Sequence, residues 1–318
     1  MGMPGAEIDD GLTILYLLAQ PTVRLVGISA TNGNGTVADA MRQTHELLAR
    51  LQTDVPLYAG TAAPAADDAA PAADDAAPAA DDAQPSAADG SPAARAIVRA
   101  SHDYEGRVVV LGLGALTNVA AAIRLDPSLP SRIAAINVMG GYRAPLSFPR
   151  RDVNELNFSS DPAAAHRVLN AGCPVTVMSA QLCLQARFGV RHLLVHNRGP
   201  AWLRPMVAEW YHAFSGATGA PGFYLWDLVP AAAVVEPERF PPVPYRLGST
   251  VHDLDTGELV LEPVSEAARP TVDLREPGIV LVPDRIRARH RFAGERARAW
   301  NSAARAAVAG TRTGANGV

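Results

Sequence analysis

The chain has 318 residues, 48% hydrophobic and 19% charged, which is enough apolar sequence to bury a substantial core. Its 28 basic and 32 acidic residues give a net charge of −4, which argues against a nucleic-acid-binding surface, because such surfaces are strongly basic. No apolar run approaches the roughly 20 residues of a membrane span, and the Met-Gly-Met-Pro-Gly start does not resemble a signal peptide, so we expect a cytoplasmic protein without membrane contact.

The first part of the chain alternates helical and strand patterns. Apolar residues at helical spacing predict a helix over 8–19, and Asp9 and Asp10 stand at its start, where carboxylates suit the helix dipole. The pattern then predicts, in order, a strand, a loop, a helix and a strand: 23–29, 31–35, 37–51 and 55–59. This alternation is typical of a parallel sheet covered by helices on both faces.

Residues 62–94 interrupt the alternation. The unit Pro-Ala-Ala-Asp-Asp-Ala-Ala recurs between Pro64 and Ala83, and the segment has no large apolar residue. Because such acidic, low-complexity sequence cannot bury enough apolar surface to pack, we predict a disordered surface insertion. The insertion lies within a single domain that spans 1–318.

The alternation resumes after the insertion. Strands are predicted at five places: 107–114, 133–139, 175–178, around Tyr245 and 278–282. Helices are predicted between and after them: from Thr117, over 161–171, over 200–214, after Asp227 and over 291–309. We therefore predict an α/β fold with a single open, mostly parallel sheet flanked by helices.

The cysteines and two histidines fit structural roles. Cys173 and Cys183 are too few for a disulfide framework and are expected to be buried small hydrophobic residues. His166 and His212 fall in predicted helices and are interpreted as structural or surface residues.

Polar clusters fall at or after predicted strand ends or at a helix start. The run Glu7-Ile-Asp-Asp places like charges side by side, which a nearby cation or sugar would explain, although simple helix capping is an alternative. Thr31-Asn-Gly-Asn-Gly could bind sugar hydroxyls or form an ordinary turn. The remaining clusters are Leu113-Gly-Ala-Leu-Thr-Asn, Asn154-Glu-Leu-Asn-Phe and Asp227. Because open α/β sheets bind ligands at the carboxyl ends of their strands, one pocket could gather these groups.

In this order, the motifs resemble those of the inosine/uridine-preferring nucleoside hydrolase family. Gly5-Ala-Glu-Ile-Asp-Asp-Gly-Leu is similar to the second half of that family's opening motif, an Asp-x-Asp-x-Gly followed by an Asp-Asp pair. Later signatures are matched by Gly33-Asn34, Gly114-Ala-Leu-Thr-Asn, Val138-Met-Gly-Gly, Asn154-Glu-Leu-Asn with Asp161-Pro, and Trp226-Asp227. The resemblance implies a nucleoside hydrolase of purine or pyrimidine salvage that releases ribose and a free base, and it implies a homo-oligomer.

The resemblance also implies residue roles. Asp10, the backbone carbonyl of Thr117 and Asp227 would bind Ca²⁺, with a Ca²⁺-bound water as the nucleophile. Anionic groups around the ribose would stabilise the oxocarbenium-like state of glycosidic cleavage. Substrate-binding roles fall on Asp9, Asn34, Met139, Glu155 and Asn157. Apart from the resemblance, the aromatic rings of Tyr224 and Trp226 are further candidates for substrate binding. For Trp226, stacking on a base and a core position are equally good interpretations.

The sequence departs from the family pattern at its start. Aligned through Pro4-Gly5, Met3 occupies the place of the Asp that would be the general base, and a thioether cannot take that role. The opening strand is missing too, which should expose the backbone edges of its neighbours. A truncated enzyme and a degenerate paralogue both explain this, and we favour truncation because the other site residues are present.

Two other functions stay open at this point. One is a non-catalytic nucleoside- or ribose-binding paralogue, since Met3 cannot act as a base and Trp226 replaces the His found in many relatives. The other is a dinucleotide-binding enzyme. Leu111-Gly-Leu-Gly offers only part of the required glycine pattern and disfavours it.

Overall fold

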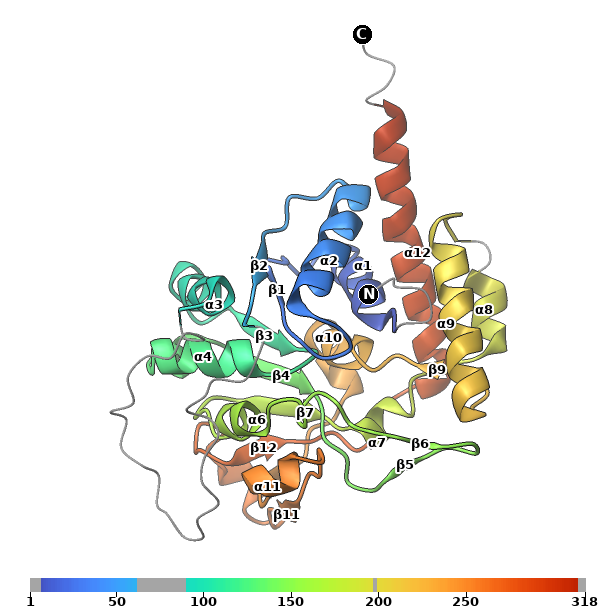
Figure 1. The fold of residues 1–318 in the computed structure, drawn as a ribbon. Helices are drawn as coiled ribbons and strands as arrows, with labels where there is room; N and C mark the ends of the chain where they lie inside the picture. The colour runs from blue at the N-terminus through green and yellow to red at the C-terminus, as the bar shows by residue number, and fades with distance from the viewer. Residues whose placement is uncertain (1–6, 62–89, 197–198, 314–318) are drawn as a thin grey trace.

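In a computed structural model of the chain, which describes residues 7–61, 90–196 and 199–313, the main sheet has six strands in the order β11-β10-β12-β7-β4-β3 (Figure 1). Four of them are parallel: β3 (Val109–Gly112), β4 (Ala135–Met139), β7 (Val175–Met178) and β12 (Ile279–Leu281). Two antiparallel strands extend the sheet beyond β12: β10 (Pro244–Leu247), which pairs with β12, and β11 (Leu261–Pro263), which pairs with β10. The predicted α/β fold with a mostly parallel sheet is confirmed.

A second, two-stranded parallel sheet stands apart from the first. It pairs β1 (Ile28–Ala30) with β2 (Leu57–Ala59), and within the described residues neither strand pairs with the six-stranded sheet. The predicted central sheet is thus accompanied by a small second sheet. The strand predicted over 23–29 is shorter than expected, because residues 23–27 pair with no strand in the described part of the chain.

Helices cover both faces of the main sheet, and side chains alternate between them. Ile136 and Val138 of β4 and Val175 and Val177 of β7 pack in one apolar cluster with α4 (Thr117–Leu125) and α6 (Pro162–Leu169). Met139 and Met178 belong to the opposite cluster, with α1 (Asp9–Leu18), α10 (Leu228–Val235) and α12 (Arg289–Thr313). This period of two is the expected result of a pleated strand between two helical layers.

The remaining elements complete the two layers. The longer helices are α2 (Val37–Leu51), α3 (Pro92–Asp103), α8 (Val190–His196) and α9 (Leu203–Thr218). The short helices are α5 (Leu129–Arg132), α7 (Ala180–Cys183), α11 (Val251–Leu254) and the 3₁₀ turns Pro237–Arg239 and Arg269–Thr271. Two small antiparallel pairs join β5 (Leu146–Ser147) with β6 (Asp152–Val153) and β8 (Arg187–Phe188) with β9 (Phe223–Tyr224).

The end of the predicted insertion requires a correction. Residues 62–89 lie outside the described residues, but 92–94 form the first turn of α3 rather than a disordered segment. Ser91 caps this helix, since its hydroxyl accepts a hydrogen bond from the Ala94 amide at 3.1 Å, and Pro92 suits the first helical position. Ala93 and Ala94 are completely buried.

The cysteines and the two histidines lie where the sequence predicted. Cys173 and Cys183 are free thiols and are buried, as predicted. His166 lies in α6 and His212 in α9. None of the helices in the described part of the chain is long and apolar enough to span a bilayer.

Candidate active site

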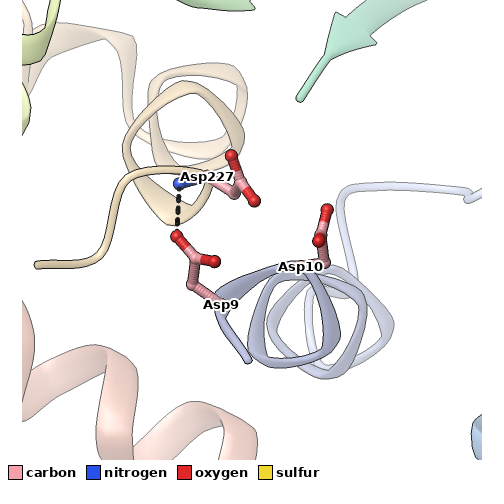
Figure 2. Close-up of side chains that lie close together, drawn as sticks. All are labelled: Asp9, Asp10 and Asp227. Atoms are coloured by element: carbon pink, nitrogen blue, oxygen red, sulfur yellow. Dashed lines mark hydrogen bonds between the residues drawn. The ribbon is translucent and has the colours of Figure 1, made fainter. Parts of the chain in front are cut away.

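Three aspartates from two helix starts converge at the centre of the molecule. Asp9 and Asp10 are the first residues of α1, and Asp227 is the N-cap of α10. Each offers a carboxylate oxygen, and these oxygens lie within 4.8 Å of one another (Figure 2). The Asp227 amide donates a hydrogen bond of 3.2 Å to Asp9 Oδ2, across 218 residues of sequence. The positive ends of two helix dipoles therefore meet at this acidic cluster.

The acidic cluster carries more negative charge than the described protein groups around it can offset. Burial raises the pKa of both Asp9 and Asp227 well above the usual range, and the neighbouring carboxylates raise it further. Asp9 Oδ1 is buried and accepts no hydrogen bond within the described structure. Buried like charges are stable together only if protonated or bound to a cation. The all-oxygen donor set and the unpartnered Oδ1 fit a hard divalent metal ion.

Glu7, two residues before the start of α1, adds another carboxylate beside the acidic cluster. Burial, followed by the charge of Asp10, raises the pKa of Glu7 to about 7. Asn34, on the loop after β1, donates a hydrogen bond from Nδ2 to Glu7 Oε2 at 3.0 Å. The sequence marked Glu7 as part of an acidic run but assigned it no role of its own.

A cavity of about 780 Å³ opens beside the acidic cluster. Most of the predicted site residues line it: Asp9, Asp10, Asn34, Met139, Glu155, Asn157, Trp226 and Asp227. Tyr224 and Thr117 are not among the lining residues, and Met3 lies outside the described residues. The cavity also extends between β1 and β3, away from the aspartates.

Glu155 and Asn157 are fixed by backbone hydrogen bonds on the loop after β6. The buried Glu155 carboxylate accepts from the amides of Asn157 (2.8 Å), Phe158 (3.0 Å) and Ser159 (3.2 Å). Burial still raises the pKa of Glu155. Asn157 Nδ2 donates to the Met139 carbonyl at 3.1 Å and to the Leu113 carbonyl at 3.3 Å, so the loop is tied to the ends of β4 and β3.

Thr117 and Asn118 connect the start of α4 to its surroundings. The buried Thr117 hydroxyl donates to Asp161 Oδ2, and Asp161 Oδ1 accepts from the Ala164 amide at 3.0 Å as the cap of α6. The Thr117 side chain therefore joins two helix starts, while the metal-binding role of its carbonyl stays a prediction. Asn118 Nδ2 donates to the Ala30 carbonyl at 2.9 Å, a contact that the sequence did not indicate.

An aromatic wall closes another side of the cavity. We use this name for Phe148, Trp210, Phe214, Tyr224 and Trp226, of which Trp210, Phe214 and Trp226 line the cavity. Tyr224 lies behind Trp226, with ring centroids 5.3 Å apart, and is 5.7 Å from Phe148. Trp210 and Phe214 were missed from the sequence, although their spacing of one helical turn indicated a shared face.

A buried thiol lies close to the backbone of Trp226. Cys183 Sγ lies 3.7 Å from the Trp226 carbonyl oxygen, and burial raises the pKa of this thiol well above its usual range. No histidine is found among the described residues that line the cavity. The described lining therefore offers aromatic surface, carboxylates and amides for ligand binding, and no imidazole for proton transfer.

Comparisons with known proteins point in one direction. A family model described as inosine-uridine preferring nucleoside hydrolase matches residues 4–304. A probable uridine nucleosidase 1 from Oryza sativa is 32% identical over 247 residues, covering 73% of this chain and 75% of its own. Uridine nucleosidase 1 of Arabidopsis thaliana is 29% identical over 251 residues, 73% of this chain and 72% of its own.

Solved structures share the fold. A purine-preferring ribonucleoside hydrolase from Gardnerella vaginalis superposes with a TM-score of 0.74 at 22% identity, covering 95% of this chain and 97% of that one. A plant nucleoside hydrolase gives a TM-score of 0.73 at 18% identity, over 94% and 96% of the two chains.

Proposed function

Because the chain belongs to the inosine-uridine preferring nucleoside hydrolase family, we propose that its cavity binds a ribonucleoside and that the surrounding residues hydrolyse the N-glycosidic bond. The products are ribose and a free base. The observation that carries this proposal is the acidic cluster of Asp9, Asp10 and Asp227 at one end of a cavity lined on another side by aromatic rings.

The residue types suit a ribose at the acidic end. Carboxylates and amides accept and donate hydrogen bonds to sugar hydroxyls, and we assign Asp9 and Asn34 to one side of the ring. Glu155 and Asn157 are assigned to the 5′ side, over a floor formed by Met139. Glycosidic cleavage develops positive charge on the ribose, and a ring of buried carboxylates stabilises that charge more strongly than water would.

The acidic cluster fits calcium. Asp10 and Asp227 would hold the ion through carboxylate oxygens, with the Thr117 carbonyl as a further ligand. Bound calcium would supply the positive charge that lets these carboxylates ionise together and would orient a water molecule toward the ribose. Asp9 keeps its hydrogen bond from the Asp227 amide and, through it, positions the start of α10.

The aromatic wall is assigned to the nucleobase. Trp226 offers a ring for stacking, backed by Tyr224, and Trp210 and Phe214 extend the apolar surface. The two plant relatives carry names as uridine nucleosidases, so uridine is the first substrate to test. Inosine is the matching purine, because it pairs the same ribose with a larger base.

The test is release of free base from uridine and inosine, with added Ca²⁺ and with a chelator, together with calorimetric binding of the same nucleosides. Hydrolysis that needs Ca²⁺ supports the proposal. Binding without hydrolysis would mean a nucleoside-binding protein, and neither binding nor hydrolysis would refute the site.

Met3 provides a specific variant for the same assay. If the family's general base belongs at this position, Met3→Asp should raise base release by roughly 100-fold or more, the usual contribution of a positioned base. Met3→Asn is the matched control, because an amide has the same shape but cannot take a proton. Equal rates for both variants would mean that position 3 does not supply the base.

A further inference from the structure

The β-hairpin formed by β5 and β6 presents one of its faces to the cavity. Leu146 pairs with Val153, and both residues line the cavity. The pair that follows along the hairpin is exposed and points the other way. Because side chains alternate between the two faces of a strand, Phe148 and Arg151 at the tip return to the cavity side. Arg151 does line the cavity, and its carbonyl accepts a hydrogen bond from the Phe148 amide at 3.1 Å.

The tip of this hairpin is fixed to the end of α9, beside the aromatic wall (Figure 1). Arg150 donates from its amide to the Thr218 carbonyl at 3.0 Å, and from its guanidinium to a second carbonyl in the last turn of α9. The Phe148 ring lies edge-on to the Phe214 ring, with centroids 5.8 Å apart. These contacts hold Arg151, the residue after Arg150, at the aromatic end of the cavity.

Arg151 brings a positive charge to the cavity that no protein group neutralises. Its guanidinium is exposed and makes no hydrogen bond, ion pair or ring contact in the described part of the chain. The other arginines of the described lining belong to α3 and to the amino ends of β1 and β3, away from the aromatic wall: Arg24, Arg99 and Arg107. Among the described lining residues, Arg151 is therefore the cation placed to meet a base on that wall.

Cleavage of a glycosidic bond separates charge along the length of the cavity. When the bond between C1′ of the ribose and N1 of uracil breaks, its electron pair stays on the base, and positive charge develops on the ribose. In the proposed orientation the acidic cluster faces that positive charge, but it repels an anionic base. The negative charge of the base is spread over N1 and the two carbonyl oxygens, and no histidine of the described lining can protonate it. A cation at the aromatic end would lower the free energy of this charge-separated state.

We propose that Arg151 is a catalytic residue that stabilises the departing base as an anion, through hydrogen bonds from its guanidinium to a carbonyl oxygen of the base. This inference rests on the proposed function, in which the base lies against the aromatic wall. The guanidinium keeps its proton, because arginine stays charged in proteins. The attacking water adds its oxygen to C1′ and releases one proton to solvent, and the base takes up one proton from solvent after it has left. This role favours bases with carbonyl oxygens, such as uracil, over adenine, which has none.

The test compares two ribosides whose leaving groups differ in their stability as anions. Uridine releases a weakly acidic base, whereas p-nitrophenyl riboside releases a phenolate that is stable without help. Arg151→Gln should lower kcat for uridine by about 100-fold, the usual effect of removing one donor to a developing anion, and should change kcat for p-nitrophenyl riboside little. Arg151→Lys, which keeps the charge, should recover part of the loss. Arg191→Gln, at an exposed arginine of α8 that does not line the cavity, is the matched control.

A binding experiment tests the same residue without turnover. 5-Fluorouracil loses a proton near neutral pH, so calorimetry on either side of that pH compares its neutral and anionic forms. We expect the parent to bind the anion more tightly than the neutral base, and Arg151→Gln to lose this preference. The acidic cluster is the same in both proteins, so the difference between them reports Arg151. A parent that hydrolyses neither riboside would contradict the proposed function, whereas the binding preference would still test Arg151.

Three results would overturn the proposal. Equal losses for uridine and p-nitrophenyl riboside in Arg151→Gln would mean that Arg151 acts on the ribose or on the fold. A preference for the fluorouracil anion that is absent from the parent, or equal in parent and variant, would remove Arg151 from the base. A variant that loses affinity only for uridine 5′-monophosphate, and keeps that for uridine, would assign Arg151 to a 5′-phosphate instead.

Discussion

The acidic cluster and Glu155 are both buried carboxylate sites on the same cavity, and they differ in how their oxygens are satisfied. Glu155 accepts hydrogen bonds from three backbone amides of its own loop. In the acidic cluster, one amide serves Asp9 Oδ2, while Asp9 Oδ1 has no described partner and two more carboxylates lie within 4.8 Å. The first arrangement is complete within the protein, and the second requires protons or a cation.

This difference separates a carboxylate that its own loop satisfies from carboxylates that we propose bind an ion. A carboxylate with sufficient donors contributes to stability, whereas a crowded group of carboxylates opposes folding until a cation neutralises it. The following predictions test that distinction.

The largest effect is expected at Asp10, the cluster member that is least buried and therefore easiest to replace. Asp10→Asn should lower kcat/KM for uridine by about 100-fold or more, because it removes charge from the metal site. The variant should fold at least as stably as the parent without Ca²⁺, since one like charge is gone. Asp54→Asn, on the exposed surface, is the control. An Asp10 variant with unchanged activity would contradict the assignment of the cluster.

Calcium itself should stabilise the parent protein. At a concentration 100 times its dissociation constant, an ion that binds only the folded state adds about 2.7 kcal/mol to the free energy of unfolding. Thermal unfolding with Ca²⁺ and with a chelator measures this. The increase should disappear in Asp10→Asn and persist in Asp54→Asn, and a Ca²⁺ effect that survives in both variants would place the ion elsewhere.

Replacement of Glu155 should lower the stability of the protein and leave its stabilisation by Ca²⁺ unchanged, the reverse of the result expected for Asp10→Asn. Glu155→Gln keeps the shape but weakens the hydrogen bonds from the loop amides, so we expect a loss of roughly 1–3 kcal/mol in the free energy of unfolding. The Ca²⁺-induced stabilisation should stay as large as in the parent. Loss of that stabilisation would show that Glu155 belongs to the ion site and that the two regions are not distinct.

The smallest effect is expected at the aromatic wall. Trp226→Leu removes ring stacking, which contributes about 0.5–1.5 kcal/mol and corresponds to roughly 2- to 10-fold weaker uridine binding. Free ribose should bind equally well to the variant and the parent, because it has no base to stack. Calorimetry with both ligands makes this comparison, and a matching loss for ribose would assign Trp226 to the sugar.

The sequence predicted helices well where their signals were local. The helix expected over 37–51 has those bounds, because the Thr36 hydroxyl caps the Asp39 amide at 3.1 Å and Gln52 turns into the left-handed region at its end. The strand predicted over 23–29 was too long, because strand pairing depends on a partner from another part of the chain. The separation of β1 from β3 is likewise a property of tertiary packing.

The residues of the candidate active site show the same division between what motifs in the sequence indicate and what tertiary packing decides. Asp9, Asp10 and Asp227 were predicted from motif order, and the structure brings them together across 218 residues. Trp210 and Phe214 were missed because an aromatic pair on a helix packs into a core as readily as it lines a cavity, and the choice depends on how α9 is oriented. The Asn118 contact with the Ala30 carbonyl could not be predicted, since it joins a helix to a distant strand.

The two cysteines lie in different parts of the core, so their labelling rates report local opening at two separate places. Cys183 lies 3.7 Å from the Trp226 carbonyl oxygen, and the charges of Asp227 and Asp9 add to the burial that raises the pKa of its thiol. Cys173 belongs instead to the cluster of apolar residues around α4 and α6. Both thiols are buried, so each can react with an alkylating reagent only when its surroundings open. A ligand in the cavity would therefore slow the labelling of Cys183 selectively, and the ratio of the two labelling rates would measure site occupancy without any turnover.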